Sequence, residues 1–270
     1  MKRACCCSLV AVLSLANLWA QEAPKIVKFQ PNGPSGKGLT EPYGTGAGKG
    51  LIYQYYASKA NKGVAAGIFE SADYIDPMHK STNSEFIALI KGSFTLQDKS
   101  GREETFKAGD TLLIPRGTEF AWKHSENVKE YWVVFDFNPP SGVPTAQTAS
   151  KAAPTFIRFE ADGPAGKGLG PIPNAREYKY YSGPNGSSAG VWETDQLKSP
   201  NFHKAQLSEL MVILKGSVTL SAPDGYSEIF NGGDVVLVPR GVDYKWNSGK
   251  VRKFWLDFDG DSVSEVQAKK

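Results

Sequence analysis

The chain has 270 residues, of which 22% are charged and 11% aromatic, and its formal net charge is +3 at pH 7. Its lysines and arginines are scattered without a block of like charge, so the sequence lacks the basic footprint expected for nucleic-acid binding or for an anionic membrane surface. The three cysteines, Cys5, Cys6 and Cys7, all lie close to the N-terminus.

Residues 1–20 have the pattern of a secretory signal peptide. An apolar stretch follows Lys2 and Arg3 and ends at Ala20, a small residue of the type found at cleavage sites. The stretch is too short and too interrupted for a comfortable membrane span, and an uncleaved segment that retains the protein at the membrane is the alternative. Cleavage would leave a net charge of about +1 and no cysteine. We therefore expect an exported protein, periplasmic or secreted, without disulfides or thiolate metal ligands.

The remainder of the chain is an internal duplication. Six segments occur twice in the same order: IVKFQPNGPSGKGL (26–39) and FIRFEADGPAGKGL (156–169), YQYY (53–56) and YKYY (178–181), AGIFES (66–71) and AGVWET (189–194), SEFIALIKGSFTL (84–96) and SELMVILKGSVTL (208–220), FKAGDTLLIPRG (106–117) and FNGGDVVLVPRG (230–241), and EYWVVFDF (130–137) and KFWLDFDG (253–260). Residues 138–154 are rich in Pro, Ser, Thr and Ala, which predicts a linker. We expect one copy over 21–137, a second over 155–262, and a polar tail over 263–270.

Each copy is predicted to be a run of short strands. Residues 85–97 carry β-branched and aromatic residues in near alternation, with a Lys-Gly kink or turn inside. Residues 110–115 form a compact apolar strand between a Gly-Asp turn and a Pro-x-Gly turn, and residues 129–137 form a closing strand. The second copy repeats this pattern. Since no long stretch shows a helical period with caps, the sequence predicts an all-β sandwich or barrel.

Glycine, proline and glutamate recur in both copies at a fixed spacing. The first set runs from Glu85 to Gly92 and from Glu209 to Gly216, and the second comprises Gly109, Pro115 and Gly117, with Gly233, Pro239 and Gly241 in the other copy. This spacing resembles the two motifs of the cupins, G(x)5HxH(x)3-4E(x)6G and G(x)5PxG(x)2H(x)3N. The resemblance implies two tandem jelly-roll barrels that form a pseudo-dimer within one chain. Within the cupins it extends to the subgroup that includes the (S)-ureidoglycine aminohydrolase cupin domains.

The GPxGKGL segment of each copy is predicted to be a glycine-rich turn. It is not a phosphate-binding Walker A loop, because no Ser or Thr follows Lys37 or Lys167. We expect these segments to lead strands that cross to, or cover, the neighbouring barrel.

Each copy retains two of the four metal ligands that the cupin resemblance implies. His79 and Glu85 match the first His and the Glu of the first motif, as do His203 and Glu209 in the second copy. Two ligands leave too many open positions for a stable divalent ion, so we expect no cofactor. The alternative is a divalent metal in the first barrel, held by His79, Glu85 and His124.

The two missing ligand positions hold other residues. Ser81 and Ala205 stand at the second His of the first motif, and Phe120 and Tyr244 stand at the His of the second motif. Residues two apart in a strand share a face, so an inward-facing Phe120 predicts that Trp122 also points into the barrel. The same argument applies to Tyr244 and Trp246, and Phe69 and Trp192 occupy matched positions on another strand.

Three functions follow from these residues. The first is an exported, metal-free bicupin that binds a small polar or aromatic ligand, through His79, Glu85, Phe120 and Trp122 or through His203, Glu209, Tyr244 and Trp246. The second is a metal-dependent enzyme similar to the ureidoglycine aminohydrolases. The third is a structural protein whose barrels are filled by their own side chains. The sequence leaves open whether the protein is an enzyme, indicates no nucleic-acid partner and no membrane after cleavage, and is compatible with a homo-oligomer.

Overall fold

The computed structural model describes residues 25–44, 49–58, 63–136, 156–165, 167–183 and 186–259, except for the side chain of His124. The predicted signal peptide, the predicted linker 138–154 and the predicted tail 263–270 lie outside these residues. All regular elements in the described part of the chain are β-strands. Correspondingly, the described residues contain no helix that is long and apolar enough to span a membrane.

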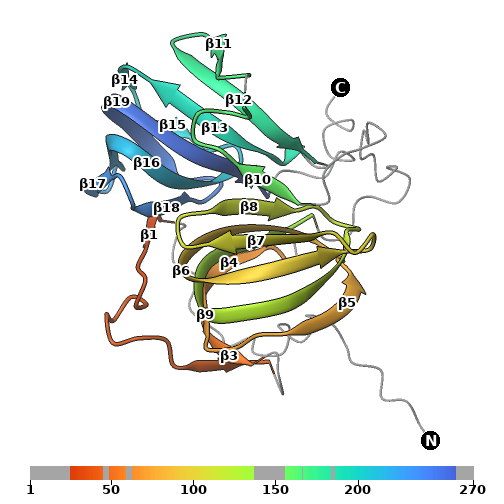
Figure 1. Ribbon diagram of the computed structural model, residues 1–270. Coiled ribbons are helices and arrows are strands. Elements are labelled where there is room, and N and C mark those ends of the chain that lie inside the picture. Colours follow the sequence, from red (N-terminus) through yellow and green to blue (C-terminus); the bar gives the residue numbers. More distant parts are fainter. Residues whose placement is uncertain are drawn as a thin grey trace, which may run out of the picture.

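The strands form two antiparallel sheets, each curled into a barrel (Figure 1). The sheet of barrel 1 has nine strands in the order β10-β8-β6-β9-β4-β3-β2, with β5 paired to β9 and β7 paired to β6. These strands are β2 (Glu41–Tyr43), β3 (Gly50–Ala57), β4 (Ala65–Ser71), β5 (Asp76–Lys80), β6 (Ser84–Asp98), β7 (Glu103–Lys107), β8 (Thr111–Ile114), β9 (Glu119–Phe135) and β10 (Ile157–Phe159).

The sheet of barrel 2 has ten strands in the order β1-β18-β16-β19-β13-β12-β11, with β14 and β15 paired to β19 and β17 paired to β16. These strands are β1 (Val27–Phe29), β11 (Gly170–Ile172), β12 (Ala175–Ser182), β13 (Ser188–Thr194), β14 (Leu197–Lys198), β15 (His203–Lys204), β16 (Ser208–Ser221), β17 (Ser227–Asn231), β18 (Val235–Val238) and β19 (Asp243–Phe258). The two sheets share one strand order, which confirms the predicted pair of all-β barrels.

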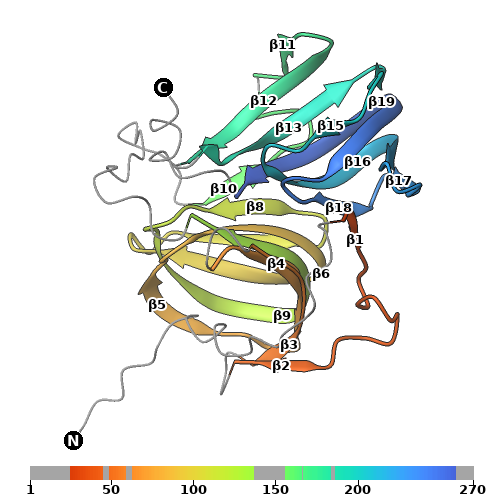
Figure 2. The ribbon, with the colours of Figure 1, turned by 180° about the vertical axis from the view of Figure 1, so that it is seen from behind.

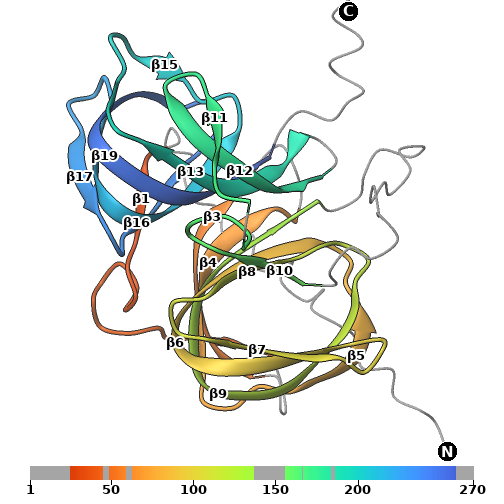
Figure 3. The same ribbon diagram turned by 45° about the horizontal axis from the view of Figure 1, so that its top comes forward.

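The sheet of each barrel is extended at one edge by a strand from the other copy. β1 pairs with β18, where Lys28 lies opposite Val236, and β10 pairs with β8, where Arg158 lies opposite Leu112. Figures 2 and 3 show β1 and the segment that follows it running from the edge of barrel 2 back to barrel 1. Strands therefore cross between the barrels, as predicted, but they stand before the GPxGKGL turns, whereas the prediction placed them after these turns.

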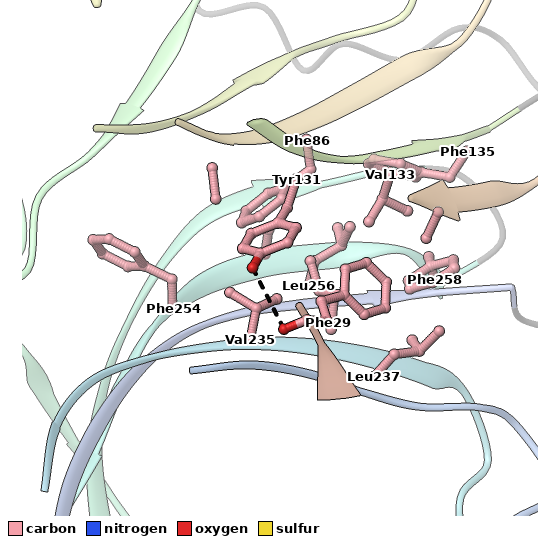
Figure 4. Packing of buried hydrophobic residues seen from close by; sticks show 14 of the residues in the cluster. Phe29, Phe86, Tyr131, Val133, Phe135, Val235, Leu237, Phe254, Leu256 and Phe258 are labelled. Atoms are coloured by element: carbon pink, nitrogen blue, oxygen red, sulfur yellow. Dashed lines mark hydrogen bonds between the residues drawn. The ribbon is translucent and has the colours of Figure 1, made fainter. Parts of the chain in front are cut away.

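Alternate residues of each strand serve two different cores. In β6, Ile87 and Leu89 face the interior of barrel 1, whereas Phe86 and Ala88 face barrel 2. The core between the barrels includes Phe29, Tyr131, Val133, Phe135, Val235, Leu237, Phe254, Leu256 and Phe258 (Figure 4). In that core the Tyr131 hydroxyl donates to the Phe29 carbonyl at 3.4 Å.

Two buried aspartates add a polar contact between the barrels, and each accepts a hydrogen bond from a tyrosine of the other copy. The Tyr181 hydroxyl donates to Asp136 Oδ2 at 2.7 Å, and the Tyr56 hydroxyl donates to Asp259. Tyr56 and Tyr181 are matched positions of the repeat, so these hydrogen bonds are related by its pseudo-twofold axis. Satisfied buried polar groups of this kind fix one relative placement of the barrels.

The Lys-Gly-Ser kink predicted inside the long strands is present. The pairing of β6 with β9 shifts register between Lys91 and Ser93, and Gly92 lies between them with a φ of +77°. A Cβ on Gly92 would lie 2.1 Å from the carbonyl oxygen of Glu126. Only glycine fits this backbone, and the bulge turns the strand around the barrel.

Candidate functional site

In both barrels the retained histidine of the first motif lies against the aromatic residue that replaces the second-motif histidine. β5 pairs with β9 so that His79 lies opposite Phe120, and their ring centroids are 4.7 Å apart. β15 pairs with β19 so that His203 lies opposite Tyr244, with centroids 4.2 Å apart. The ring contact therefore occupies the place where a metal-binding cupin would bring two imidazoles together.

Aromatic side chains line the interior of barrel 1, as the strand periodicity predicts. Phe120 and Trp122 are buried, with ring centroids 6.4 Å apart, and Trp122 contacts Tyr74 at 5.5 Å. Phe69 belongs to the same cluster. Phe156 enters this cluster from the second copy, just before β10, and lies 6.1 Å from Phe120. One wall of barrel 1 thus depends on the exchanged segment.

Glu85 extends from β6 into this interior. It shares a strand face with Ile87 and lies between Ile114 of β8 and Val134 of β9 in the sheet register. Its side chain is partly exposed. Burial among apolar neighbours raises the pKa of Glu85 to about 7, because the surroundings solvate a carboxylate poorly.

A second carboxyl group, Glu130 of β9, lies in the same interior, although no motif pointed to it. It shares a strand face with Trp132 and lies opposite Phe69 of β4 and Leu89 of β6. Glu130 is only 5% exposed, and its Oε2 atom has no hydrogen-bond partner. Burial raises its pKa well above the ordinary value, and the charge of Glu85 raises it further. A buried polar group without a partner is rare enough to need an explanation.

Four more polar residues stand around the two carboxyl groups of barrel 1. Asp76 Oδ2 and the Pro77 carbonyl lie 3.4 Å and 3.0 Å from His79 Nδ1. Burial raises the pKa of the Tyr43 and Tyr74 hydroxyl groups, and the charges of Glu85 and Asp76 raise both further. His79 thus contacts Asp76, and both tyrosines lie close enough to Glu85 and Asp76 for these charges to raise their pKa values.

Barrel 2 has a different arrangement at the matched positions. Lys253 of β19 takes the place of Glu130, and its Nζ atom lies 2.5 Å from Glu209 Oε1 and 3.2 Å from Met211 Sδ. The same ammonium lies 4.6 Å from the ring centroid of Trp246 and 5.1 Å from that of Trp192. The aromatic lining predicted for barrel 2 therefore surrounds a cation of the chain itself.

Two further acidic and basic positions distinguish barrel 2. Burial, together with the charge of Glu209, raises the pKa of Asp257 to about 7, and Lys253 partly opposes that rise. Burial and the charge of Glu209 also raise the pKa of Tyr244. His203 is exposed at the end of the barrel. Val134 takes the place of Asp257 in barrel 1, so the two interiors differ in both charge and shape.

The residues present do not fit the metal centre that the cupin motifs imply. Across the described residues, no three His, Cys, Asp or Glu side chains gather where they could hold one metal ion. Phe120 and Tyr244 offer no donor comparable to an imidazole, and Lys253 holds the Glu209 carboxylate. The side chain of His124 lies outside the described residues, so the set His79, Glu85 and His124 stays a hypothesis.

The duplicated barrel, its exchanged strands and the two motif frames define a cupin-fold protein with two barrels. Residues 60–131 match the family model described as the EutQ-like cupin domain. A search of curated protein sequences found no match.

Several solved structures share the fold. A DUF861-family protein of unknown function from Pseudomonas syringae pv. tomato str. DC3000 is 20% identical, with a TM-score of 0.62 over 87% of this chain and 100% of that chain. A putative glyoxylate-induced protein from Pseudomonas aeruginosa is 12% identical, with a TM-score of 0.53 over 77% of this chain and 80% of that one. The DUF861 protein Ylba from E. coli is 12% identical, with a TM-score of 0.52 over 92% and 96%. At these identities the likeness shows the fold alone.

Sequence reasoning named eight aromatic and acidic positions but missed Glu130 and Lys253; the eight are Phe69, Glu85, Phe120, Trp122, Trp192, Glu209, Tyr244 and Trp246. Both open the last repeated segment, EYWVVFDF and KFWLDFDG, at the same position. Each lies two residues before a tryptophan of the interior, Trp132 or Trp255, and strand periodicity therefore predicts that both side chains point inward. A change from an acid to a base at one inward-facing position of a repeat marks a difference between two otherwise matched sites.

Proposed function

We propose that the protein is an exported, metal-free cupin that binds a small molecule in barrel 1, while barrel 2 serves mainly as scaffold. The observation that carries this proposal is the unpartnered Glu130 carboxylate beside the aromatic wall of barrel 1. A buried carboxyl without a partner destabilises a fold, whereas a polar ligand that donates hydrogen bonds to it would recover that free energy on binding.

One feature supports a difference between the barrels. Glu85 and Glu209 are both partly exposed, but only Glu209 is paired with a cation of the chain, since Lys253 lies beside it in barrel 2. Small barrels are commonly filled by their own side chains, and that description suits barrel 2. The ligand expected in barrel 1 has a polar group for Glu85 and Glu130 and an apolar or flat part for Trp122.

A thermal-shift screen of the purified protein against divalent metals, sugars, amines and purine catabolites tests this function. A ligand that binds only the folded protein raises its melting temperature. The shift should disappear in Trp122→Ala and persist in Trp246→Ala, which changes barrel 2 alone. No shift with any compound class, or a shift that depends equally on both tryptophans, would contradict the proposal.

The metal-dependent aminohydrolase similar to the ureidoglycine enzymes is the alternative that the motif resemblance invites. It requires a tightly bound divalent ion, and the described residues offer no ligand set for one. Metal analysis of the purified protein separates the two proposals, because the aminohydrolase needs about one tight divalent ion per chain.

Export is part of the proposal and rests on residues 1–20. Mass spectrometry of the protein from periplasmic and culture fractions tests it. We expect a mature chain that begins near residue 21 and lacks all three cysteines. A full-length mass in the membrane fraction would contradict export and favour the uncleaved segment.

A further inference from the structure

In barrel 2, the Lys253 side chain occupies the interior in the way that a bound organic cation would. The Lys253 side chain consists of a four-carbon stem and an ammonium group, and it lies across the barrel interior with its nitrogen 2.5 Å from Glu209 Oε1. The faces of Trp246 and Trp192 stand 4.6 Å and 5.1 Å from that nitrogen. A carboxylate and two aromatic faces are the ordinary means by which proteins hold an ammonium group.

The same framework stands in barrel 1. Trp192 lies opposite Lys253 in the sheet register, as Phe69 lies opposite Glu130. Lys253 also pairs with Ile213 across β16, as Glu130 pairs with Leu89 across β6. The repeat therefore places Glu85, Trp122 and Phe69 around the position where barrel 2 has its ammonium group.

What barrel 1 lacks is the cation. Glu130 replaces Lys253, so the interior holds two carboxyl groups in place of an ion pair. Among the described residues, neither Glu85 nor Glu130 has a hydrogen-bond or ion-pair partner. A glutamate side chain is also shorter than a lysine side chain. The exchange therefore replaces the ammonium group with a carboxyl group and shortens the side chain that reaches the centre of the barrel.

We propose that barrel 1 binds a small organic primary ammonium ion. Its nitrogen takes the position that matches the Lys253 ammonium, between the carboxyl groups of Glu85 and Glu130. Its hydrocarbon part lies against the rings of Trp122 and Phe69. This inference rests on the proposed ligand-binding function of barrel 1 and specifies its ligand class.

The lining favours a primary ammonium over other cations. A metal ion needs more than two protein donors and gains little from an aromatic wall, whereas an organic cation uses both. A quaternary ammonium has no N–H group, so it would leave both carboxyl groups without hydrogen-bond donors. A bound ammonium favours the ionised form of both carboxyl groups, against the burial that raises both pKa values, so Glu85 and Glu130 can each accept one of its N–H hydrogen bonds.

The probe for this site is n-butylammonium chloride, which reproduces the lysine side chain beyond its Cα atom. Calorimetric titration of the full mature chain should show saturable binding of one ion per chain. Neutral n-butanol and tetramethylammonium should bind at least tenfold more weakly. Glu130→Gln should lower the affinity for n-butylammonium at least tenfold. Glu126→Gln, an exposed glutamate on the same strand, is the matched control and should change it less than twofold.

Two reciprocal variants sharpen the test. Glu130→Lys should abolish binding and raise the melting temperature, because the chain then supplies its own ammonium as in barrel 2. Lys253→Ala should raise the stoichiometry to two, since it empties the matched space around Glu209. If Glu130→Lys does not fold, Glu130→Gln still decides the question.

The outcomes separate this inference from the broader function. Absence of saturable n-butylammonium binding, or equal affinity in wild type and Glu130→Gln, would overturn the ammonium assignment. If a neutral or anionic compound then still binds in a Trp122-dependent way, the proposed ligand-binding function stands. If no compound binds barrel 1, both fail.

Discussion

The ammonium of Lys253 lies 2.5 Å from the carboxylate of Glu209 inside barrel 2, and this ion pair replaces the two acids of barrel 1. Removing one member of a buried ion pair leaves an uncompensated charge. We therefore expect Lys253→Ala to lower the free energy of unfolding by about 3–5 kcal/mol.

Urea denaturation at pH 7 measures this effect. Lys253→Met combined with Glu209→Gln removes both charges and should recover most of the loss. A loss below about 1 kcal/mol in Lys253→Ala would show that solvent already screens the pair.

Glu130→Met should have the opposite sign and make the protein more stable. The substitution keeps the length of the side chain and removes a buried carboxyl whose Oε2 has no partner. We expect a gain on the order of 1–2 kcal/mol at pH 7, measured by urea denaturation without ligand. Glu126→Met on the same strand, at an exposed position, should change stability by less than about 0.5 kcal/mol. A loss of stability in Glu130→Met would mean that the carboxyl group is favourably paired in the folded protein.

Stability should fall as the pH rises through the range in which Glu85 titrates. Burial raises the pKa of Glu85 from 4.5 to about 7, so between these values the folded protein binds more protons than the unfolded chain. Under that condition the free energy of unfolding decreases with increasing pH and levels off above about 7. The contribution is at most about 3 kcal/mol.

Other buried acids act in the same direction, and a variant isolates Glu85. The pKa values of Glu130 and Asp76 in barrel 1 are raised mainly by burial, as is that of Asp257 in barrel 2. These groups remain in Glu85→Gln, so the difference between the two pH profiles reports Glu85 together with its effect on the pKa of Glu130. Chemical denaturation from pH 4.5 to 8 should give a shallower decline in the variant. Parallel profiles would refute the assignment.

The buried tryptophans should be large contributors to stability. Trp122 and Trp246 are 7% and 5% exposed, and each belongs to the core of its own barrel. Truncation to alanine removes that packing and opens a cavity, so Trp122→Ala or Trp246→Ala should cost about 3–5 kcal/mol. Denaturant titration measures the loss. A value below about 1 kcal/mol would show that the ring is not packed as described.

The tyrosine–aspartate hydrogen bonds between the barrels should contribute to the free energy of unfolding, and Tyr→Phe substitutions measure this contribution without changing the apolar core. Tyr181→Phe removes the donor to Asp136, leaving a buried carboxylate with one partner fewer, and should cost about 1–3 kcal/mol. Tyr178→Phe on the same strand removes only an exposed bond to Lys167, so it should stay within about 0.5 kcal/mol of wild type. Equal effects of the two substitutions would contradict a role for the buried bond.

The fold could be predicted from the sequence because its signals are local. Spacing of Gly, Pro and Glu sets the turns of each barrel, and the repeat shows that there are two. The inward direction of Trp122 and Trp246 also followed from strand parity, once Phe120 and Tyr244 were placed at the lost histidine positions. Strand periodicity is a strong constraint of this kind, because a shift of one residue reverses every side chain.

The electrostatic content of the two interiors could not be predicted in the same way. The meeting of Lys253 with Glu209 depends on side-chain reach across the barrel, between strands whose register no local motif fixes. Tyr43 and Tyr74 enter barrel 1 from a short strand and an irregular segment, and the pairing of β5 with β9 shifts between Asp76 and His79. A crossing of strands was predicted, but the position of β1 and β10 before the GPxGKGL turns depends on the packing of whole barrels.

That exchange has a consequence for how the two barrels could diverge. A symmetric homodimer of identical chains that swap a strand must carry the same side chain at both copies of every position. When the two copies are joined in one chain, matched positions can hold different side chains, while the exchanged strands β1 and β10 still connect the two barrels. Glu130 and Lys253 show the result, since a single position now holds opposite charges in two otherwise equivalent barrels. One half can therefore take on a new chemistry while the other keeps the assembly stable.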